Sequence, residues 1–507
     1  MMKQWATAAS AAALALAITT PDAAAQKSKD TLRIAWEQTV ENVDNYYNTN
    51  REGILFSRMV WDTLVDRDPK TFKTIPNLAT AWKWVDDRTL EMELRQGVKF
   101  HNGEEFDADD VVFTLNYISN PENKVINQSN VSWIEKAEKL DKFKIRIITK
   151  KPFPAALEFL TIPIVMYPNE YYAKVGPKEM GLKPVGTGPY KATKIVPTKE
   201  YTLERWEGHF EGGSKPHAKI KNIVIRTIPE MSTQIAELLA GGLDWIWYVP
   251  VDQADRLETV PSLQVVRAET MRVGYIGMDA AGRTPVKALQ DVRVRQAIAH
   301  AIDRPAIVKN LIGGKSRVLD APCFPTQFGC DNSVAAKYPY NPAKAKELLA
   351  AAGYKDGFEM EFFAYRPRDW SEAILGYLNA VGIKPKLTQM TYFAVRDKNH
   401  ANATPTYFMD WGSYSINDVS AILPNFFAGS GDDYARDPEV KAWLEAGGST
   451  VDEAVRKENY SKAIKRITEQ AYWLPMFTFV TNYGMTKDLN FEAFADELPR
   501  YYLYGWK

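Results

Sequence analysis

The stretch KFHNGEEFDADDVVFTL, Lys99–Leu115, places one histidine, five carboxylates and one glycine within 17 residues. Such a concentration of polar groups is typical of a catalytic or metal-binding centre. The local pattern instead predicts a strand, a turn at Asn102-Gly103 and a helix that begins after Asp107. Carboxylates at a helix start accept unpaired backbone N–H groups and oppose the helix dipole. We therefore predict a structural segment in which Asp107 and Asp110 are both ionised.

The N-terminus has the pattern of an export signal. MMKQWATAASAAALALAITTPDAAAQ, residues 1–26, contains a basic Lys3, a short apolar run and small residues before Gln26. The run is too short to span a bilayer, and Ala-Ala-Ala before Gln26 suits signal peptidase. We predict a signal peptide over residues 1–25 rather than an ordinary helix. No cysteine follows the cleavage point, so we expect a periplasmic chain without a lipid anchor.

The composition is that of a soluble protein with several domains or one large multi-lobed unit. The chain has 507 residues, of which 45% are hydrophobic and 25% are charged. Lys+Arg and Asp+Glu balance at 63 each, so the chain lacks the basic footprint of a nucleic-acid-binding protein. Segments with strand patterns, such as KNIVIRTI and FEMEFFAY, alternate with helical ones. This alternation predicts an α/β fold with mixed sheets.

Motifs for catalysis and metal binding are missing from the sequence. It contains no H-E-x-x-H, no G-x-S-x-G, no Walker lysine loop and no G-x-G-x-x-G after a strand. Cys323 and Cys330, in CFPTQFGC, are the two cysteines, and in an oxidising compartment they predict a disulfide. The alternative is a metal site, for which two thiols without a nearby histidine are poor ligands. We predict neither an enzyme nor a cofactor.

LRQGVKFHNGEEFDADDVVFTL resembles the signature of family 5 extracellular solute-binding proteins. These are the periplasmic receptors of ABC importers for dipeptides, oligopeptides, nickel, glutathione, opines and some oligosaccharides. The resemblance covers nearly the whole mature chain. Further segments follow in the family's order: VGTGPY (185–190), IAELLAGGLDWI (235–246), DVRVRQAIAHAIDR (291–304), YNPAKAKELLAAAGY (340–354) and LNAVGIKPKL (378–387).

The resemblance implies a two-lobed, hinge-linked periplasmic-binding-protein fold. The first lobe would comprise residues 26–270 and 481–507, with a subdomain inserted at about 75–185, and the second lobe residues 271–480. A solute bound between the lobes would favour the closed form, which the ABC permease and ATPase complex then recognises. The protein is expected to be a monomer without catalysis. A secreted hydrolase and a periplasmic chaperone or sensor partner are the rival interpretations.

The segment YFMDWGSYSINDVSAILPNFF, residues 407–427, corresponds to the loop that lines the solute pocket in the family. Peptide-binding members usually carry an aspartate three residues after the tryptophan, where this chain has Tyr414 after Trp411. A phenol cannot form the charge-assisted pair that holds an ammonium group. Asp418 would substitute if the loop shifts, or else it caps the following helix. Strand alternation is expected to turn Asp410 to the face opposite Trp411.

These residues leave the class of solute open. A neutral, polyhydroxylated solute would stack on aromatic rings. An opine, an amino-acid conjugate or a modified peptide would use an arginine as a carboxylate clamp. A nickel chelate near His400 and Arg396 is a further alternative. The predicted ligand-binding residues are Trp36, Glu37, Arg366, Arg368, Arg396, Tyr407, Trp411, Tyr414 and Asp418.

Overall fold

The computed structural model describes residues 30–48 and 50–507, so the predicted signal peptide lies outside the described part of the chain. A ten-stranded sheet runs through the molecule in the order β14-β13-β15-β12-β16-β11-β1-β10-β9-β8. Its strands are β1 (Thr31–Trp36), β8 (Tyr190–Val196), β9 (Glu200–Arg205), β10 (Asn222–Thr227), β11 (Trp245–Ile246), β12 (Leu263–Met278), β13 (Glu359–Ala364), β14 (Lys384–Gln389), β15 (Thr406–Trp411) and β16 (Trp473–Thr486).

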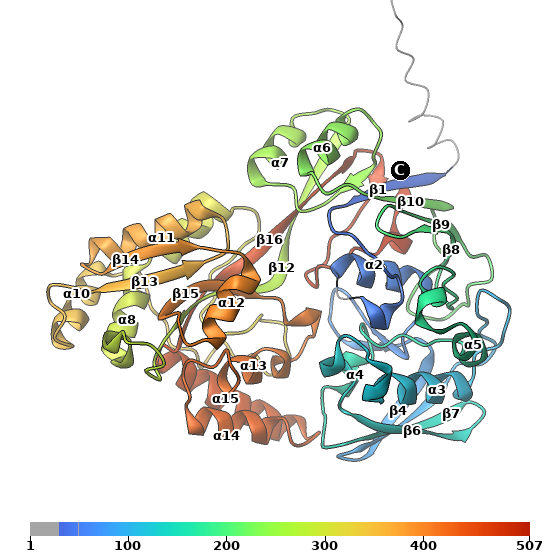
Figure 1. Ribbon diagram of the computed structural model, residues 1–507, viewed down its shortest axis with the longest axis horizontal. Helices are drawn as coiled ribbons and strands as arrows, with labels where there is room; N and C mark the ends of the chain where they lie inside the picture. Colours follow the sequence, from blue (N-terminus) through green and yellow to red (C-terminus); the bar gives the residue numbers. More distant parts are fainter. Residues whose placement is uncertain (1–29, 49) are drawn as a thin grey trace, which may run out of the picture.

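Two long antiparallel strands, β12 and β16, connect the two lobes (Figure 1). The C-terminal end of β16 pairs with β11 in the first lobe, whereas the C-terminal end of β12 pairs with β15 in the second lobe. The register between β12 and β16 shifts twice between Glu269 and Tyr275. Bulges bend and twist a strand locally, so the sheet changes direction where it passes from one lobe to the other.

The first lobe surrounds β1, which lies parallel to β10 on one side and to β11 on the other. All six residues of β1 are buried, as expected for a central parallel strand. A separate four-stranded sheet packs below it, in the order β4-β5-β7-β6. The remaining elements are α2 (Arg51–Val60), β2 (Val65–Arg67), β3 (Thr74–Pro76), β4 (Ala79–Asp86), β5 (Thr89–Leu94), α3 (Ala108–Ser119), β6 (Ile134–Asp141), β7 (Lys144–Thr149), α4 (Ala156–Phe159), α5 (Asn169–Met180), α6 (Met231–Leu239), α7 (Val251–Glu258), β17 (Leu489–Asn490) and β18 (Gly505–Trp506).

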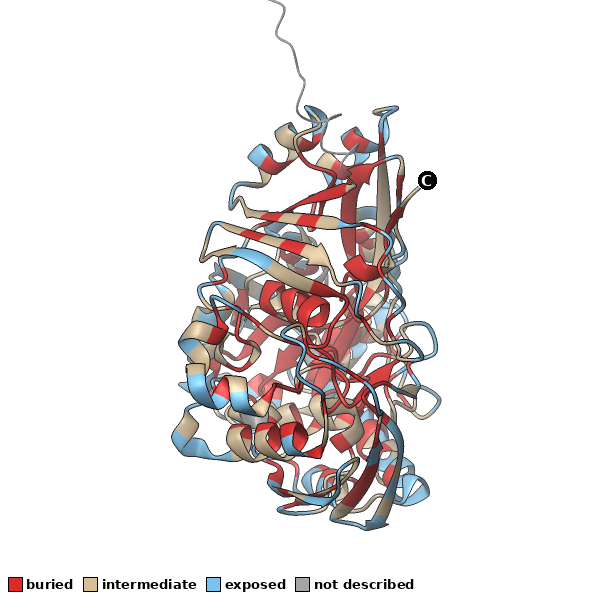
Figure 2. Cartoon of the chain, turned by 90° about the vertical axis from the view of Figure 1, so that its right-hand side faces the viewer, coloured by how far each residue is buried: buried red, intermediate tan, exposed pale blue. Residues whose placement is uncertain are grey.

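The second lobe has a mixed sheet, since β13 is parallel to β14 and β15 while β15 is antiparallel to β12. Its apolar core includes Phe362, Phe408 and Phe477. Buried residues fill the interior of the molecule, and exposed residues follow its loops and outer helices (Figure 2). The helices are α8 (Val292–Ala301), α9 (Arg304–Ile307), α10 (Pro342–Ala351), α11 (Arg368–Ala380), α12 (Tyr392–His400), α13 (Leu423–Phe427), α14 (Pro438–Gly447) and α15 (Glu453–Glu469).

The polar stretch at Lys99–Leu115 forms the predicted turn and helix start. Gly103 has a φ of 92°, and α3 begins after Asp107, which accepts a hydrogen bond from the Asp109 backbone N–H. The expectation that both Asp107 and Asp110 are ionised is wrong. The Asp110 side chain accepts from the backbone N–H of Asp107, but burial raises the pKa of Asp110 to about 7.

The α/β, two-lobed fold class predicted from the sequence is therefore confirmed. The lobe boundaries at residues 270 and 480, and the limits of the inserted subdomain, stay predictions. Within residues 30–48 and 50–507, the structure contains no helix that is both long enough and apolar enough to cross a bilayer.

Candidate functional site

A cavity of about 470 Å³ lies where β12 and β16 pass between the lobes. Both lobes contribute to its wall, together with the two connecting strands and the C-terminal segment. Its volume falls in the usual range for small-molecule sites. The lining residues are Arg51, Tyr248, Arg272, Tyr365, Arg366, Tyr392, Asp410, Trp411, Gly412, Phe479, Val480, Thr481 and Glu497.

The wall carries three arginines and two carboxylates, so positive charge is in excess by one. Arg272 is central: its Nε lies 3.0 Å from Glu497 Oε2, and its Nη1 lies 3.5 Å from Asp410 Oδ2. Arg51 Nη2 lies 3.4 Å from Glu497 Oε2, and Arg366 donates to Asp410 Oδ2. Each carboxylate thus contacts two arginines, and Arg272 contacts both carboxylates. The three guanidinium groups therefore share two negative charges.

Burial shifts the ionisation of two of these groups. Loss of solvation, and secondly the charge of Arg272, lowers the pKa of Arg366 to about 9. Loss of solvation raises the pKa of Asp410 to about 6, although Arg272 opposes this change. Burial would also raise the pKa of Glu497, but Arg272 and Arg51 outweigh it and the pKa is lowered. The Asp410–Arg366 side of the cavity is therefore the side where charge is least well compensated.

Aromatic rings form the rest of the wall. The Arg366 guanidinium lies 4.4 Å from the centre of the Phe479 ring and 4.8 Å from that of Tyr365. Trp411 is half-buried, donates its Nε1–H to the Ala421 carbonyl at 3.3 Å and meets Phe426 edge-on. Such rings hold cations and flat or apolar parts of a solute in defined orientations.

Trp411 and Arg366 are the two predicted ligand-binding residues that the structure brings to the cavity. Asp410 also lines it, contrary to the expectation from strand alternation. β15 ends at Trp411, and the cavity extends past this end to Gly412, so side chains from both strand faces border it. On β12, Gly274 pairs with Asp410, whose carboxylate lies 3.5 Å from Nη1 of Arg272.

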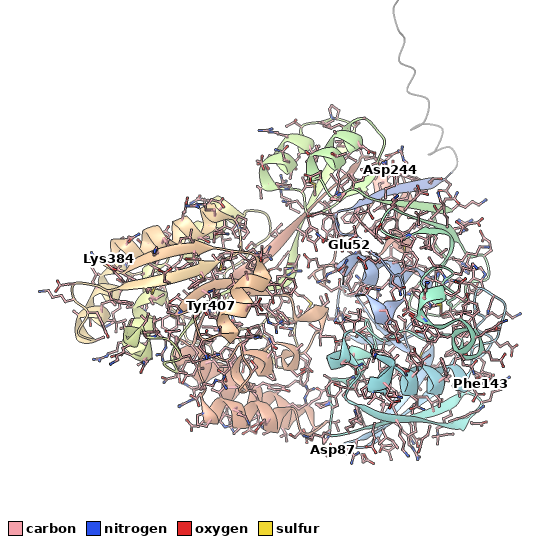
Figure 3. All side chains as sticks on the ribbon, in the orientation of Figure 1. Glu52, Asp87, Phe143, Asp244, Lys384 and Tyr407 are labelled. Carbon is pink, nitrogen blue, oxygen red and sulfur yellow. A yellow bond between two sulfur atoms is a disulfide. The ribbon has the colours of Figure 1, made fainter. Side chains whose placement is uncertain are left out.

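Two other predicted residues, Tyr407 and Trp36, are buried away from the cavity. Tyr407 lies inside the second lobe (Figure 3), fully buried with its ring edge-on to Tyr275 and Tyr434. Trp36 is fully buried in the first lobe and donates its Nε1–H to Tyr501 Oη at 3.2 Å. Whether an aromatic ring on a strand is buried depends on the elements that pack over it, and the strand pattern in the sequence does not show this.

Asp418 is a helix cap, as its alternative interpretation proposed. Its carboxylate accepts from the Ser420 backbone N–H at 2.9 Å and lies 2.7 Å from Arg456 Nη2. Asp418 is not among the residues that line the cavity, and its carboxylate is engaged by the helix start and by Arg456. The side chain of Tyr414 lies outside the part of the chain that is described.

The remaining three predicted residues lie outside the cavity on the surface or near it. Arg368 is exposed and lies 2.6 Å from Glu372. Arg396 pairs with Asp432 at 3.3 Å, and this carboxylate is also 3.2 Å from His400 Nε2. Glu37 is half-buried, and burial together with Glu230 raises its pKa.

Several lining residues were missed by the sequence analysis. Arg51, Arg272, Tyr248 and Glu497 come from four separate segments. No local motif identifies these residues. They have in common only that the fold around the paired strands β12 and β16 brings them to one cavity. Only knowledge of the strand pairing could have identified them.

The two cysteines lie apart from this cavity. Cys323 and Cys330 form a disulfide. Among the residues that the structure describes, no group of three His, Cys, Asp or Glu side chains is arranged to hold a metal ion.

Comparisons with known proteins agree with this architecture. Residues 73–434 match the model of the bacterial extracellular solute-binding proteins, family 5. The glutathione-binding protein GsiB of Pectobacterium atrosepticum is 29% identical over 427 residues, which cover 81% of each chain. The heme-binding protein A of Haemophilus influenzae is 26% identical over 456 residues, covering 83% of this chain and 82% of that protein.

The fold also matches solved structures. HbpA2 from Haemophilus parasuis superposes with a TM-score of 0.81 at 22% identity, over 94% of this chain and 100% of HbpA2. Proteins of this family are binding components of ABC importers. Because the family match spans most of the described chain, we conclude that this protein belongs to the family 5 bacterial extracellular solute-binding proteins.

Proposed function

We propose that this protein binds a small solute bearing at least one carboxylate, peptide-like or opine-like, in the cavity between its lobes. It then presents the closed, loaded form to an inner-membrane permease and ATPase complex. In this proposal the mature chain is a periplasmic monomer, released after cleavage near Ala25, that neither anchors to lipid nor alters its solute.

The excess of positive charge in the cavity carries this proposal. Among the residues that line the cavity, the three arginines Arg51, Arg272 and Arg366 are matched by two carboxylates, Asp410 and Glu497. A solute carboxylate would offset the excess and replace the water that burial removes from the guanidinium groups. Charge-assisted hydrogen bonds of this kind each contribute about 1.5–3 kcal/mol.

The similarity to glutathione-binding proteins supports the same class of solute. Glutathione carries two carboxylates and one ammonium group at neutral pH, and so has one net negative charge. This charge is the complement of the cavity's excess.

The two alternatives fit the cavity less well. A neutral oligosaccharide could stack on Trp411 but would leave the positive charge uncompensated. For a nickel chelate, no histidine is present among the residues lining the cavity, and His400 pairs with Asp432 instead.

Calorimetric titration of purified protein with glutathione, a dipeptide, an opine and maltotriose tests the proposal. Arg366→Gln should weaken binding of the acidic solutes by about 10- to 100-fold, since 1.4 kcal/mol corresponds to a factor of ten. Arg368→Gln is the matched control, because Arg368 lies two residues away but outside the cavity. Its binding should equal that of wild type.

Two results would contradict the proposal. One is tight binding of maltotriose with none of the acids, and the other is equal binding by the two arginine variants. Mass spectrometry of the solute recovered from the complex checks the expectation that it leaves unchanged.

A further inference from the structure

A second-lobe loop makes direct polar contacts with the first lobe. This latch loop, Ser413–Asp418, follows β15. The Ser415 carbonyl accepts from Arg67 Nη1 at 2.6 Å, and Ser415 Oγ accepts from Arg51 Nη1 at 2.8 Å. The Asn417 backbone N–H donates to Glu158 Oε2 at 2.8 Å. The three first-lobe partners lie on different elements, α2, β2 and α4.

These contacts are shielded from water. Ser415 and Arg67 are each 1% exposed, and Asn417 is 7% exposed. Each contact has a charged partner, a guanidinium donor or a carboxylate acceptor, and such hydrogen bonds are roughly twice as strong as neutral ones. Separation of the lobes would break all three together, because a single short loop carries them.

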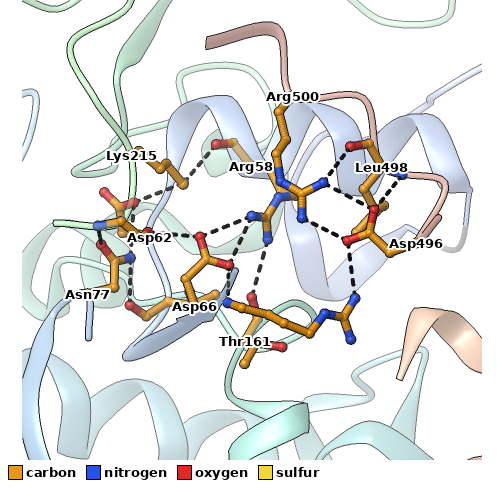
Figure 4. Close-up of polar contacts among 12 residues, drawn as sticks. Arg58, Asp62, Asp66, Asn77, Thr161, Lys215, Asp496, Leu498 and Arg500 are labelled. Atoms are coloured by element: carbon orange, nitrogen blue, oxygen red, sulfur yellow. Dashed lines mark hydrogen bonds and ion pairs between the residues drawn. The ribbon is translucent and has the colours of Figure 1, made fainter. Parts of the chain in front are cut away.

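The first-lobe side of the contact is rigidly held. Arg67 Nη2 lies 3.2 Å from Asp496 Oδ2, which Arg500 also contacts at 2.7 Å. Figure 4 shows the Arg500–Asp496 pair and, beside it, the buried Arg58–Asp66 pair. Asp66 Oδ1 also accepts a hydrogen bond from the Arg67 backbone N–H at 2.8 Å. Arg67 is therefore not free to follow the loop if the second lobe moves away.

The latch loop itself has an unfavourable backbone conformation. Ser413 and Ser415 have φ angles of 50° and 62°, in the left-handed region that non-glycine residues rarely occupy. Such a conformation persists only where its surroundings impose it. The loop therefore depends on contacts from outside its own sequence.

The disulfide-closed segment Cys323–Cys330, here called the brace loop, supplies such contacts. The Phe328 backbone N–H donates to the Asn417 carbonyl at 2.9 Å, and Gln327 Nε2 donates to the Ile416 carbonyl at 3.0 Å. Arg456 joins both loops, since it pairs with Asp418 and lies 4.4 Å above the Phe328 ring.

We propose that the latch loop is a clasp that holds the two lobes closed, and that the Cys323–Cys330 disulfide positions it. In an oxidising compartment the brace loop keeps the latch loop in reach of Arg51, Arg67 and Glu158. Loss of the disulfide would free the brace loop, loosen the latch loop and shorten the time for which the lobes stay closed. This device goes beyond the proposed solute class and does not depend on it.

The test uses solute-free protein, so it is independent of the solute proposal. Ser415→Ala removes the hydroxyl that accepts from Arg51 and donates to the Asp496 carbonyl at 2.7 Å. We expect hydrogen exchange at the Asn417 amide to rise about tenfold and the radius of gyration in small-angle scattering to increase, because one charge-assisted bond is lost.

Ser413→Ala is the matched control in the same turn. Ser413 is equally buried and also has a positive φ, but its hydroxyl has no hydrogen-bond partner among the described residues. Its exchange and scattering should match wild type. Equal hydrogen exchange at Asn417 and equal radii of gyration in the two serine variants would contradict the proposed role of the latch loop.

Cys323→Ser combined with Cys330→Ser tests the brace. Exchange at the Asn417 amide should rise while amides of the first-lobe strand β1 stay protected. If the double variant does not fold, Gln327→Ala serves instead, because it removes one contact of the brace loop and keeps the disulfide. It should also raise exchange at the Asn417 amide. Unchanged protection of Asn417 in the variant that folds would overturn the role of the disulfide.

Discussion

Two buried groups of arginines and carboxylates in this protein have the same chemistry but opposite electrostatics. In the core network, part of which Figure 4 shows, charges are balanced: Arg58, Arg67, Arg500 and Lys215 pair with Asp62, Asp66, Asp496 and Glu158. In the cavity, three arginines face two carboxylates. The comparison separates charges that hold the fold together from charges that are arranged to meet a solute.

The pKa shifts show how well each buried carboxylate is compensated by its partners. Burial would raise the pKa of Asp62, yet Lys215 and His209 bring it down to about 2. Burial likewise acts on Asp66, and Arg58 and Lys215 outweigh it to lower the pKa. At Asp410 burial prevails and the pKa is raised to about 6. Partners therefore outweigh the loss of solvation at Asp62, Asp66 and Glu497. At Asp410 and Glu158 they do not, and the pKa is raised.

The largest effect should come from breaking the balanced group. Asp66→Asn leaves Arg58 buried without its counter-charge, and we expect a loss of about 3–5 kcal/mol in the free energy of unfolding. Asp410→Asn should cost less, about 1 kcal/mol, because the Arg366 side chain that loses this counter-charge is 25% exposed, against 4% for Arg58, and Arg272 keeps Glu497 as a partner. Denaturant unfolding followed by circular dichroism measures both. Equal losses of unfolding free energy in the two variants would contradict the distinction between the balanced core network and the cavity.

An intermediate effect is expected on solute affinity as the pH changes. Asp410 protonates as the pH falls through about 6, which increases the positive excess of the cavity from one to two charges. Affinity for an acidic solute such as glutathione should therefore rise between pH 7.5 and 5.5, by several-fold and at most on the order of tenfold. Titration calorimetry at both pH values measures the change.

Asp410→Asn is the control for this pH dependence. The variant carries the larger positive excess at every pH, so its affinity should be nearly constant over the same range. A pH dependence that persists in the variant would assign the effect to a different group.

A separate effect on stability should come from another buried carboxylate, Asp110, which accepts hydrogen bonds from two backbone N–H groups. Its pKa in the folded state, about 7, exceeds the unfolded value of about 3.9. The folded state therefore binds more protons between these values, and stability decreases as the pH rises from 5 to 8.

Comparison with Asp110→Asn isolates this contribution. The stability advantage of wild type over the variant should fall by about 2–3 kcal/mol from pH 5 to pH 8, because one pH unit corresponds to about 1.4 kcal/mol, and thermal melts at both values can detect this change. A constant difference would show that Asp110 stays ionised, as its position at a helix start first suggested.

The sequence was most informative where structure depends on neighbouring residues. The start of α3 after Asp107 and the turn at Gly103 follow from capping and turn preferences, which act within a few residues. The proximity of Cys323 and Cys330 in the chain likewise makes a loop disulfide geometrically simple. Asp110 was misjudged because its ionisation depends on the layer packed over it.

By itself, the sequence determined the family, the α/β two-lobed class and the segment around Trp411 that borders the cavity. Only the tertiary structure decided which charges meet there. Arg51, Arg272 and Glu497 are far apart in the chain and come together through the pairing of β12 with β16 and the return of the C-terminal segment. Short-range preferences specify helices and turns, whereas charge compensation depends on groups that only packing brings within a few ångströms.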